Sequence, residues 1–264
     1  MGYSKEINQS KLGFSMLSDK EKKRYSRHLL LGDIGEVGQL KLSQSKVLII
    51  GLGGLGSPVA LYLAASGIGH MLLADGDTLD VTNLQRQVMF DSHGAGKLKA
   101  DLAEVRLSEL NPEVEIDVID QALTEDDLEE YVPGVDLVLD CSDNLETRKA
   151  VNRVCAENRV PLVSAAAIRW EGHLMLFDFR KPETPCYECL YPPDTAEPVL
   201  NCSTSGVVGP LLGILGSMQA LEAIKLLLGM DPDLNGRLLI FDGKYHQWQN
   251  FRIQKKVDCP VCGG

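Results

Sequence analysis

The chain has 264 residues, of which 44% are hydrophobic and 24% charged, a composition typical of a globular protein with one well-buried core. Its formal net charge of −11 argues against nucleic acid as a partner, because proteins bind phosphate backbones mainly through Lys and Arg. No apolar run of signal-peptide length opens the sequence, so we expect a cytoplasmic protein whose seven cysteines are reduced thiols or metal ligands.

Helices and strands alternate through the first two thirds of the sequence. We expect a poorly ordered tail over residues 1–17, followed by a single domain over 18–264. A capping box at Ser18 and Glu21 predicts a helix through Leu31. The elements predicted after it are strands over 47–50, 71–73, 114–119, 135–140 and from 161, and helices over 57–66, 97–110, 124–131 and 145–158. This order predicts an α/β fold with a doubly wound, Rossmann-like, mainly parallel sheet.

The character of the sequence changes after Arg169. The segments RWEGHLMLFDF, RLLIF and HQWQNFRI read as strands without helices between neighbours, which predicts an antiparallel C-terminal extension of the same sheet. The apolar stretch 207–229 has the length of a membrane span, but Gln219, Glu222 and Lys225 interrupt it at helical spacing. This polar stripe favours a helix buried in the core or in a subunit interface over a membrane span.

A glycine-rich loop follows the first predicted strand. In VLIIGLGGLGSP, Gly51, Gly53 and Gly56 fit the pattern G-x-G-x-x-G, with Gly54 between them, and a helix is predicted to follow. Asp75 ends the second strand, at the spacing of an acidic residue that accepts ribose hydroxyls. The loop therefore predicts a nucleotide site, the alternative being a turn that only allows close helix–strand packing.

Charged and polar residues follow the carboxyl ends of the predicted strands, where open α/β sheets bind ligands. They are Asp77, Asn83, Arg86, Lys99 and Asp143. Asn83, Arg86 and Lys99 are suited to neutralise phosphates, and Asp143 to hold Mg²⁺. The alternatives are solvated surface charges and, for Asp143, a helix N-cap. An NAD-dependent oxidoreductase is a further alternative, although none of the five histidines lies in a cluster that would suggest a proton donor.

Two C-x-x-C pairs, Cys186/Cys189 and Cys259/Cys262, predict a structural zinc site in the C-terminal part of the domain, about 180–264. Four thiolates fill a tetrahedral Zn²⁺ shell and leave no position for a catalytic water. A redox function is the alternative for either pair alone.

The other three cysteines are read differently from one another. Cys141 and Cys155 are expected to be small core residues. Cys202 lies in a Pro-rich polar loop, where it is a nucleophile, a redox partner or an incidental surface thiol.

These motifs resemble those of the ThiF/MoeB/HesA family of adenylyltransferases, relatives of the ubiquitin-activating enzymes. The resemblance runs from about Ser18 to Gly264, and it rests on RYSRHLLL, GLGGLGSP, the acidic segment ending NLQRQ, DCSDN, CYECL and CPVCGG. Within the family, NCSTSGVVGP, GSMQALEAIKLL and FDGKYHQW are most similar to the thiamin branch.

The resemblance implies ATP binding at the glycine loop and Asp75, phosphate contacts from Asn83, Arg86 and Lys99, Mg²⁺ at Asp143, and Zn²⁺ at the four paired cysteines. It implies that Arg27 reaches across a homodimer into the partner's site. It implies further that Cys202 joins the carrier in an acyl disulfide during sulfur transfer. Lys97 competes with Lys99 for the phosphate role, because relatives often have proline in Gly96–Leu98.

The function implied is ATP-dependent adenylylation of the C-terminal Gly-Gly carboxylate of a small ubiquitin-like sulfur carrier, a ThiS-like protein of thiamin thiazole biosynthesis, with release of pyrophosphate. A sulfurtransferase or a cysteine desulfurase would then supply sulfur for the thiocarboxylate. The alternative within the family is a MoaD-like carrier of molybdopterin synthesis.

Overall fold

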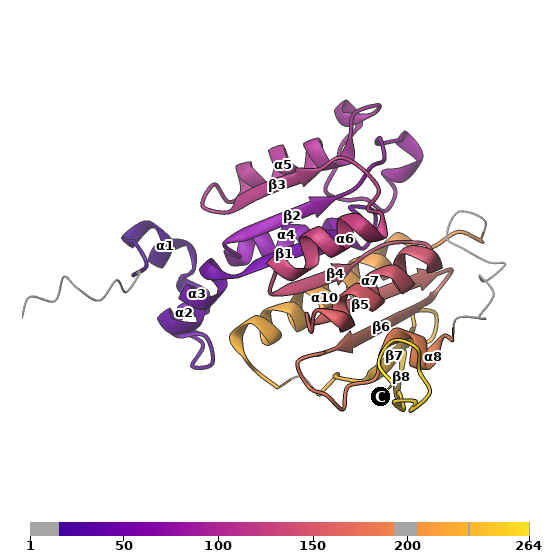
Figure 1. Ribbon diagram of the computed structural model, residues 1–264. Coiled ribbons are helices and arrows are strands. Elements are labelled where there is room, and N and C mark those ends of the chain that lie inside the picture. Colours follow the sequence, from indigo (N-terminus) through magenta and orange to yellow (C-terminus); the bar gives the residue numbers. More distant parts are fainter. Residues whose placement is uncertain (1–15, 193–204, 232, 264) are drawn as a thin grey trace, which may run out of the picture.

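A single mixed sheet runs through the molecule (Figure 1). The computed structural model describes residues 16–192, 205–231 and 233–263, and within them eight strands lie in the order β3-β2-β1-β4-β5-β6-β7-β8. The strands are β1 (Lys46–Ile50), β2 (His70–Ala74), β3 (Glu115–Ile119), β4 (Leu137–Asp140), β5 (Leu162–Ile168), β6 (Glu171–Phe177), β7 (Arg237–Asp242) and β8 (Gln247–Arg252). Strands β1 to β5 pair in parallel and β5 to β8 antiparallel, which confirms the predicted fold.

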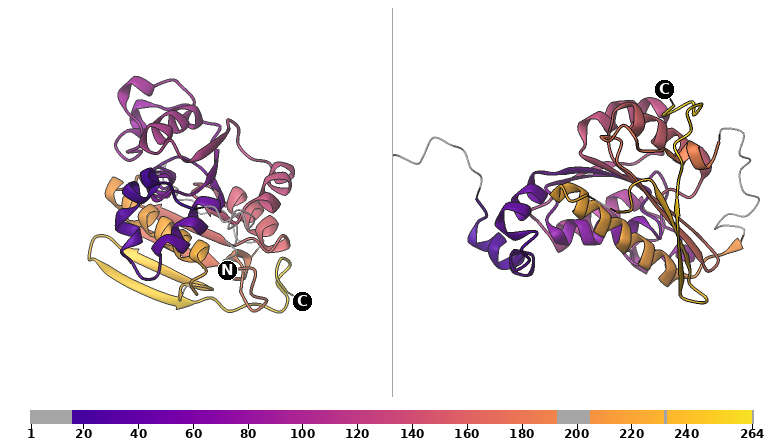
Figure 2. Two further views of the ribbon diagram at one scale, coloured as in Figure 1. Left: turned by 90° about the vertical axis from the view of Figure 1, so that its left-hand side faces the viewer. Right: turned by 90° about the horizontal axis from the view of Figure 1, so that it is seen from below.

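Helices cover both faces of the sheet (Figure 2). On one face lie α3 (Gly35–Gln44), α4 (Gly56–Ser66), α5 (Lys99–Leu110) and α10 (Gly209–Leu228). On the other face lie α6 (Glu125–Tyr131), α7 (Leu145–Glu157) and α8 (Tyr187–Leu190). Short 3-10 turns are η1 (Val81–Asn83), η2 (Ser92–Gly94) and η3 (Val132–Gly134). The central strands are apolar at nearly every position because both of their faces are buried.

The long apolar helix α10 packs in the core. By length and composition alone it could cross a membrane, but it lies against α4, β5 and β6. Gln219 and Glu222 are themselves buried, and Lys225 pairs with Glu222 at 2.8 Å. The polar stripe therefore predicted the environment of this helix correctly.

The N-terminal helix differs from its prediction. The capping box at Ser18 is present, but the helix breaks at Tyr25 into α1 (Asp19–Arg24) and α2 (Ser26–Leu29). The Tyr25 side chain is buried, its hydroxyl accepts a hydrogen bond from Asn111 at 2.9 Å, and its ring packs against Gly67. Anchoring of this ring to two distant segments turns the chain where local sequence would continue the helix.

Two further helices differ from the sequence reading. Helix α5 begins at Lys99 rather than residue 97, because the Lys97 carbonyl accepts a hydrogen bond from the Leu79 N–H at 2.8 Å. Helix α3 was not predicted, since its buried positions include Gly38 and Gln39 and give no apolar periodicity.

The order of the strands reverses between β1 and β4, so chain connections leave these neighbours in opposite directions. Such a switch point opens a crevice at the carboxyl ends of the strands. The glycine loop after β1 lies at this end, whereas α1, α2 and α3 gather at the opposite end of the sheet (Figure 1).

Candidate active site

The glycine loop is built so that its backbone forms the surface of the crevice. Gly51 has φ +89°, and a Cβ there would stand 2.8 Å from the Cys141 carbonyl oxygen. A Cβ at Gly56 would stand 1.9 Å from the carbonyl oxygen of Gly51. Any side chain at either position would push the loop away from β4 or from the start of α4. Gly53 meets only an ordinary contact, 3.5 Å from Gln87.

The loop presents free backbone donors. The N–H of Leu52 donates to Oδ2 of Asp75 at 2.7 Å. In the described part of the chain, the N–H groups of Gly53 and Gly54 meet no protein acceptor. They stand at the N-terminus of α4, where the helix dipole favours an anion. The loop therefore fits a phosphate group.

Asp75, Asp77 and Lys99 form a charged cluster beside the loop. The Lys99 Nζ lies 2.8 Å from Oδ2 of Asp77 and 4.0 Å from Oδ1 of Asp75. Burial raises the pKa of the Asp75 carboxyl above its ordinary value, although the Leu52 N–H and the Lys99 ammonium oppose this. Lys99 is buried and Lys97 is exposed, so the structure brings Lys99, and not Lys97, to the two carboxylates.

Asn83 and Arg86 lie on the turn that begins with η1. The Asn83 amide oxygen accepts from the Asp80 N–H at 3.1 Å, and Arg86 donates to the Thr82 carbonyl at 3.2 Å. The start of α10 closes on this turn, since a Cβ at Gly209 would stand 2.6 Å from the Gln85 carbonyl oxygen. Arg86 is partly exposed.

Asp143 lies in the loop between β4 and α7 with its side chain exposed. The N-cap of α7 is Asn144, whose amide oxygen accepts from the Thr147 N–H at 2.8 Å. The alternative that Asp143 serves as the N-cap is therefore wrong. A carboxylate that no capping bond engages, next to a loop that fits a phosphate group, fits Mg²⁺.

Two predicted residues stand apart from this cluster. Arg27 lies exposed on α2, at the opposite end of the sheet from the glycine loop, so within one chain it does not reach the crevice. Cys202 lies outside the described residues.

The four paired cysteines meet in space although the two pairs are far apart in sequence. Their sulfur atoms all lie within 4.8 Å of one another, with Cys186–Cys259 at 3.5 Å and Cys189–Cys262 at 3.4 Å. Burial raises the pKa of the Cys186 thiol to about 12 when no metal is present. This donor set and spacing fit a closed tetrahedral zinc site.

Cys141 and Cys155 are buried in the core, as expected. Burial raises the pKa of both thiols well above the ordinary value, so neither is suited to nucleophilic chemistry.

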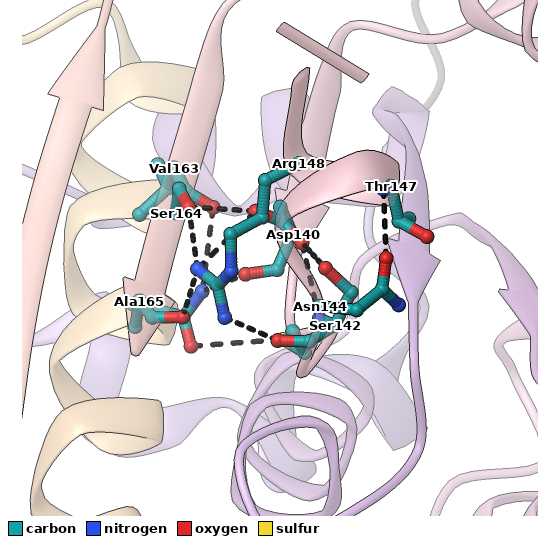
Figure 3. Close-up of polar contacts among 10 residues, drawn as sticks. Asp140, Ser142, Asn144, Thr147, Arg148, Val163, Ser164 and Ala165 are labelled. Carbon is teal, nitrogen blue, oxygen red and sulfur yellow. Dashed lines mark hydrogen bonds and ion pairs between the residues drawn. The ribbon is translucent and has the colours of Figure 1, made fainter. Parts of the chain in front are cut away.

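The sequence reading missed a buried polar network behind the β4–α7 loop. It is formed by Asp140, Ser142, Arg148 and Ser164 (Figure 3). Gln219 of α10 joins it through a hydrogen bond to the Asp140 carbonyl. One signal in the sequence could have revealed this network. Asp140 and Arg148 are charged residues at positions that the predicted strand and helix would bury. Gln87 was also missed, and its buried Oε1 has no hydrogen-bond partner in the described chain.

Comparison with known proteins places this geometry in a family. A family model described as "ThiF family" matches residues 25–261. The chain belongs to the ThiF family. This confirms the predicted family, and the named enzymes similar to the chain are adenylyltransferases, the predicted enzyme class.

Two curated relatives cover nearly all of this chain. It is 46% identical over 249 residues to the sulfur carrier protein ThiS adenylyltransferase of Escherichia coli K12, covering 94% of this chain and 98% of that protein. It is 44% identical over 248 residues to adenylyltransferase and sulfurtransferase MOCS3-1 of Drosophila pseudoobscura pseudoobscura. That match covers 93% of this chain and 54% of the relative, so the chain spans about half the length of the MOCS3 protein.

Solved structures of E. coli MccB share the fold. MccB with MccA-N7isoASN superimposes with a TM-score of 0.81 at 26% identity, over 92% of this chain and 75% of MccB. MccB with ATP gives 0.79 at 26% identity, over 93% and 75%. The ThiF-family fold is thus found in a solved structure that contains ATP.

Proposed function

We propose that this ThiF-family chain adenylylates the C-terminal carboxylate of a small ubiquitin-like sulfur carrier ending in Gly-Gly, with ATP as the donor and pyrophosphate as the product. The observation that carries the proposal is the meeting, at one switch point, of free loop amides, a buried Lys99 and a partly exposed Arg86. A ThiS-like carrier is favoured because the relative matched over 98% of its length is named for ThiS.

The chemistry requires alignment and charge neutralisation, and no general base. The carrier carboxylate is already ionised at pH 7, so it can attack the α-phosphate directly. The carboxylate and the phosphate are both anions and repel each other. In this proposal the backbone amides of Gly53 and Gly54 and the cations of Lys99 and Arg86 neutralise their charge. Mg²⁺ held by Asp143 would neutralise further charge on the phosphates. In this proposal Asp75 accepts the ribose hydroxyls, as the acidic residue after the second strand does in nucleotide-binding sheets.

We extend the proposal to the residues that lie outside the cluster. Arg27 completes the site of a second copy in a homodimer, since within its own chain it lies at the wrong end of the sheet. Cys202 acts after adenylylation, when a cytoplasmic sulfurtransferase or cysteine desulfurase delivers sulfur. Zn²⁺ at Cys186, Cys189, Cys259 and Cys262 is structural, because four thiolates complete its shell.

The test is ATP–pyrophosphate exchange with purified candidate carriers, each with and without its terminal glycine. Exchange should require the intact Gly-Gly end. Arg86→Ala should lower exchange by about 10³-fold or more, by analogy with other arginines at transferring phosphoryl groups. Cys202→Ala should exchange normally and fail only in thiocarboxylate formation. Equal loss in the two variants, or no exchange with any carrier, would refute the proposal.

A MoaD-like carrier is the second candidate, favoured by the 44% identity to a MOCS3 protein. The same exchange assay is run with a ThiS-like and with a MoaD-like carrier, and the carrier with the higher kcat/KM is the substrate. Membership of the ThiF family decides against the oxidoreductase alternative.

A further inference from the structure

Every residue of the β4–α7 loop except Asp143 is held by bonds to another part of the protein or to its own helix. The Asp140 carbonyl accepts from the Gln219 amide on α10 at 3.0 Å. The Cys141 N–H donates to the Ile50 carbonyl of β1 at 2.8 Å. Asn144 caps α7. The loop is thus held by several hydrogen bonds, and Asp143 is its one exposed carboxylate.

Arg148 supports the middle of the β4–α7 loop through its guanidinium group (Figure 3). One guanidinium nitrogen, Nη2, donates to the Ser142 carbonyl, next to Asp143. The other, Nη1, donates to the Ala165 carbonyl at 2.7 Å and to Oγ of Ser164 at 3.3 Å. The guanidinium therefore bridges the loop to β5, the neighbouring strand.

The Asp140 carboxylate completes the support. Its Oδ1 accepts from both the N–H of Ser142 at 3.0 Å and the Ser142 hydroxyl at 2.6 Å. Its Oδ2 accepts from Ser164 at 2.6 Å and lies 3.6 Å from Nη1 of Arg148. Both charged side chains are buried, with 1% of Asp140 and 7% of Arg148 exposed.

Burying such a pair adds little net stability, because desolvation offsets the attraction between the charges. An apolar pair of similar volume would serve the core as well or better. Instead, this pair fixes the orientation of the loop relative to β5. A planar guanidinium donates to two acceptors at a fixed angle, and a lysine ammonium does not.

We propose that Arg148 is a positioning residue that sets where the Asp143 carboxylate stands relative to the glycine loop, and hence how tightly a divalent cation is held on bound ATP. The two loops touch, because the position of a Cβ at Gly51 lies 2.8 Å from the Cys141 carbonyl oxygen and 3.3 Å from the Ser142 nitrogen. A shift of Ser142 therefore moves the Asp143 carboxylate relative to a glycine loop that is held by its own bonds to Ala74 and Asp75. The inference rests on the proposed role of Asp143.

The experiment compares Arg148→Lys with Asp143→Asn, with their double variant, and with Arg180→Lys as the control. Arg180 also pairs with a buried aspartate, Asp178, at 2.6 Å, but it follows β6, away from the crevice. Mn²⁺ affinity is measured by electron paramagnetic resonance on the complex with a non-hydrolysable ATP analogue. Analogue affinity without metal, the melting temperature and pyrophosphate exchange are measured alongside.

We expect Arg148→Lys to weaken Mn²⁺ binding by about 10–100-fold, the usual effect of losing a group that orients a metal ligand. Analogue affinity without metal should change by less than about twofold, and Arg180→Lys should match the wild type. In the Asp143→Asn background, Arg148→Lys should cost nothing more, because it acts through that carboxylate.

Unchanged Mn²⁺ affinity in folded Arg148→Lys, or the same added loss in the Asp143→Asn background, would overturn the inference. If Arg148→Lys does not fold, Ser164→Ala removes the hydroxyl between Asp140 and Arg148 and carries the same test. The Mn²⁺ measurement needs no carrier protein. Failure of exchange in the wild type would therefore count against the proposed function, and unchanged Mn²⁺ affinity against this inference.

Discussion

Replacing Lys99 by Met tests the charged cluster of the candidate active site most directly, with Lys97→Met as its matched control. Methionine keeps the apolar stem and most of the volume of lysine and removes the charge. Lys99 is the first residue of α5 and Lys97 precedes it by two positions, but Lys99 is 6% exposed and lies between Asp75 and Asp77. Lys97 is exposed to solvent.

The structure sets the size of the effect on stability. A unit charge pair 4 Å apart at an effective dielectric constant of about 20 gains about 4 kcal/mol, and the desolvation of Lys99, which the variant no longer has, offsets most of it. Asp75 stays buried in the variant, where its carboxylate still accepts from the N–H groups of Leu52 and Asp77. Asp77 is 76% exposed, so its pair adds at most about 1 kcal/mol. We therefore expect Lys99→Met to lose about 1–2 kcal/mol and about 3–6 °C of melting temperature.

The effect on catalysis should be larger. Removing one preorganised charge or donor from a reacting centre lowers kcat by about 10²–10³-fold. A protein with about 5–15 kcal/mol of stability remains folded after losing 1–2 kcal/mol, so unfolding would not mimic this loss.

Pyrophosphate exchange and thermal melting on both variants measure the two effects. Lys99→Met should be folded and nearly inactive, and Lys97→Met should behave as the wild type. Equal activity in the two variants, or full activity of Lys99→Met, would refute the assignment of the phosphate contact to Lys99.

Two more predictions concern the zinc site and the dimer. Metal analysis should find one Zn²⁺ per chain, and Cys259→Ser should lose it and melt about 10 °C lower, because the cluster closes a long loop; Cys155→Ser, a buried thiol outside the cluster, should keep its zinc, and full zinc in Cys259→Ser would contradict the site. Mixing Arg27→Ala with Arg86→Ala should restore about a quarter of wild-type exchange, since half of the dimers are mixed and each mixed dimer has one intact site. No recovery on mixing would mean that Arg27 does not act in the partner's site.

Several features were decided by the sequence alone, because the interactions that fix them are local. The capping box joins Ser18 to Glu21, three residues away. Gly51 and Gly56 mark a turn that no larger side chain fits, and the apolar residues of β1 require cover on both faces. Each of these signals depends on neighbours within a few positions, so the sheet and the tight glycine turn after β1 could be predicted.

The tertiary structure decided which distant residues become neighbours. Tyr25 breaks the first helix because its side chain packs against Gly67 and bonds to Asn111. Because α5 begins at Lys99, this lysine and not Lys97 reaches the two carboxylates. Ser164 bonds to both Asp140 and Arg148 only because β4 pairs with β5. A contact between segments far apart in the chain is fixed by the packing of whole elements, and the local pattern around either residue does not contain it.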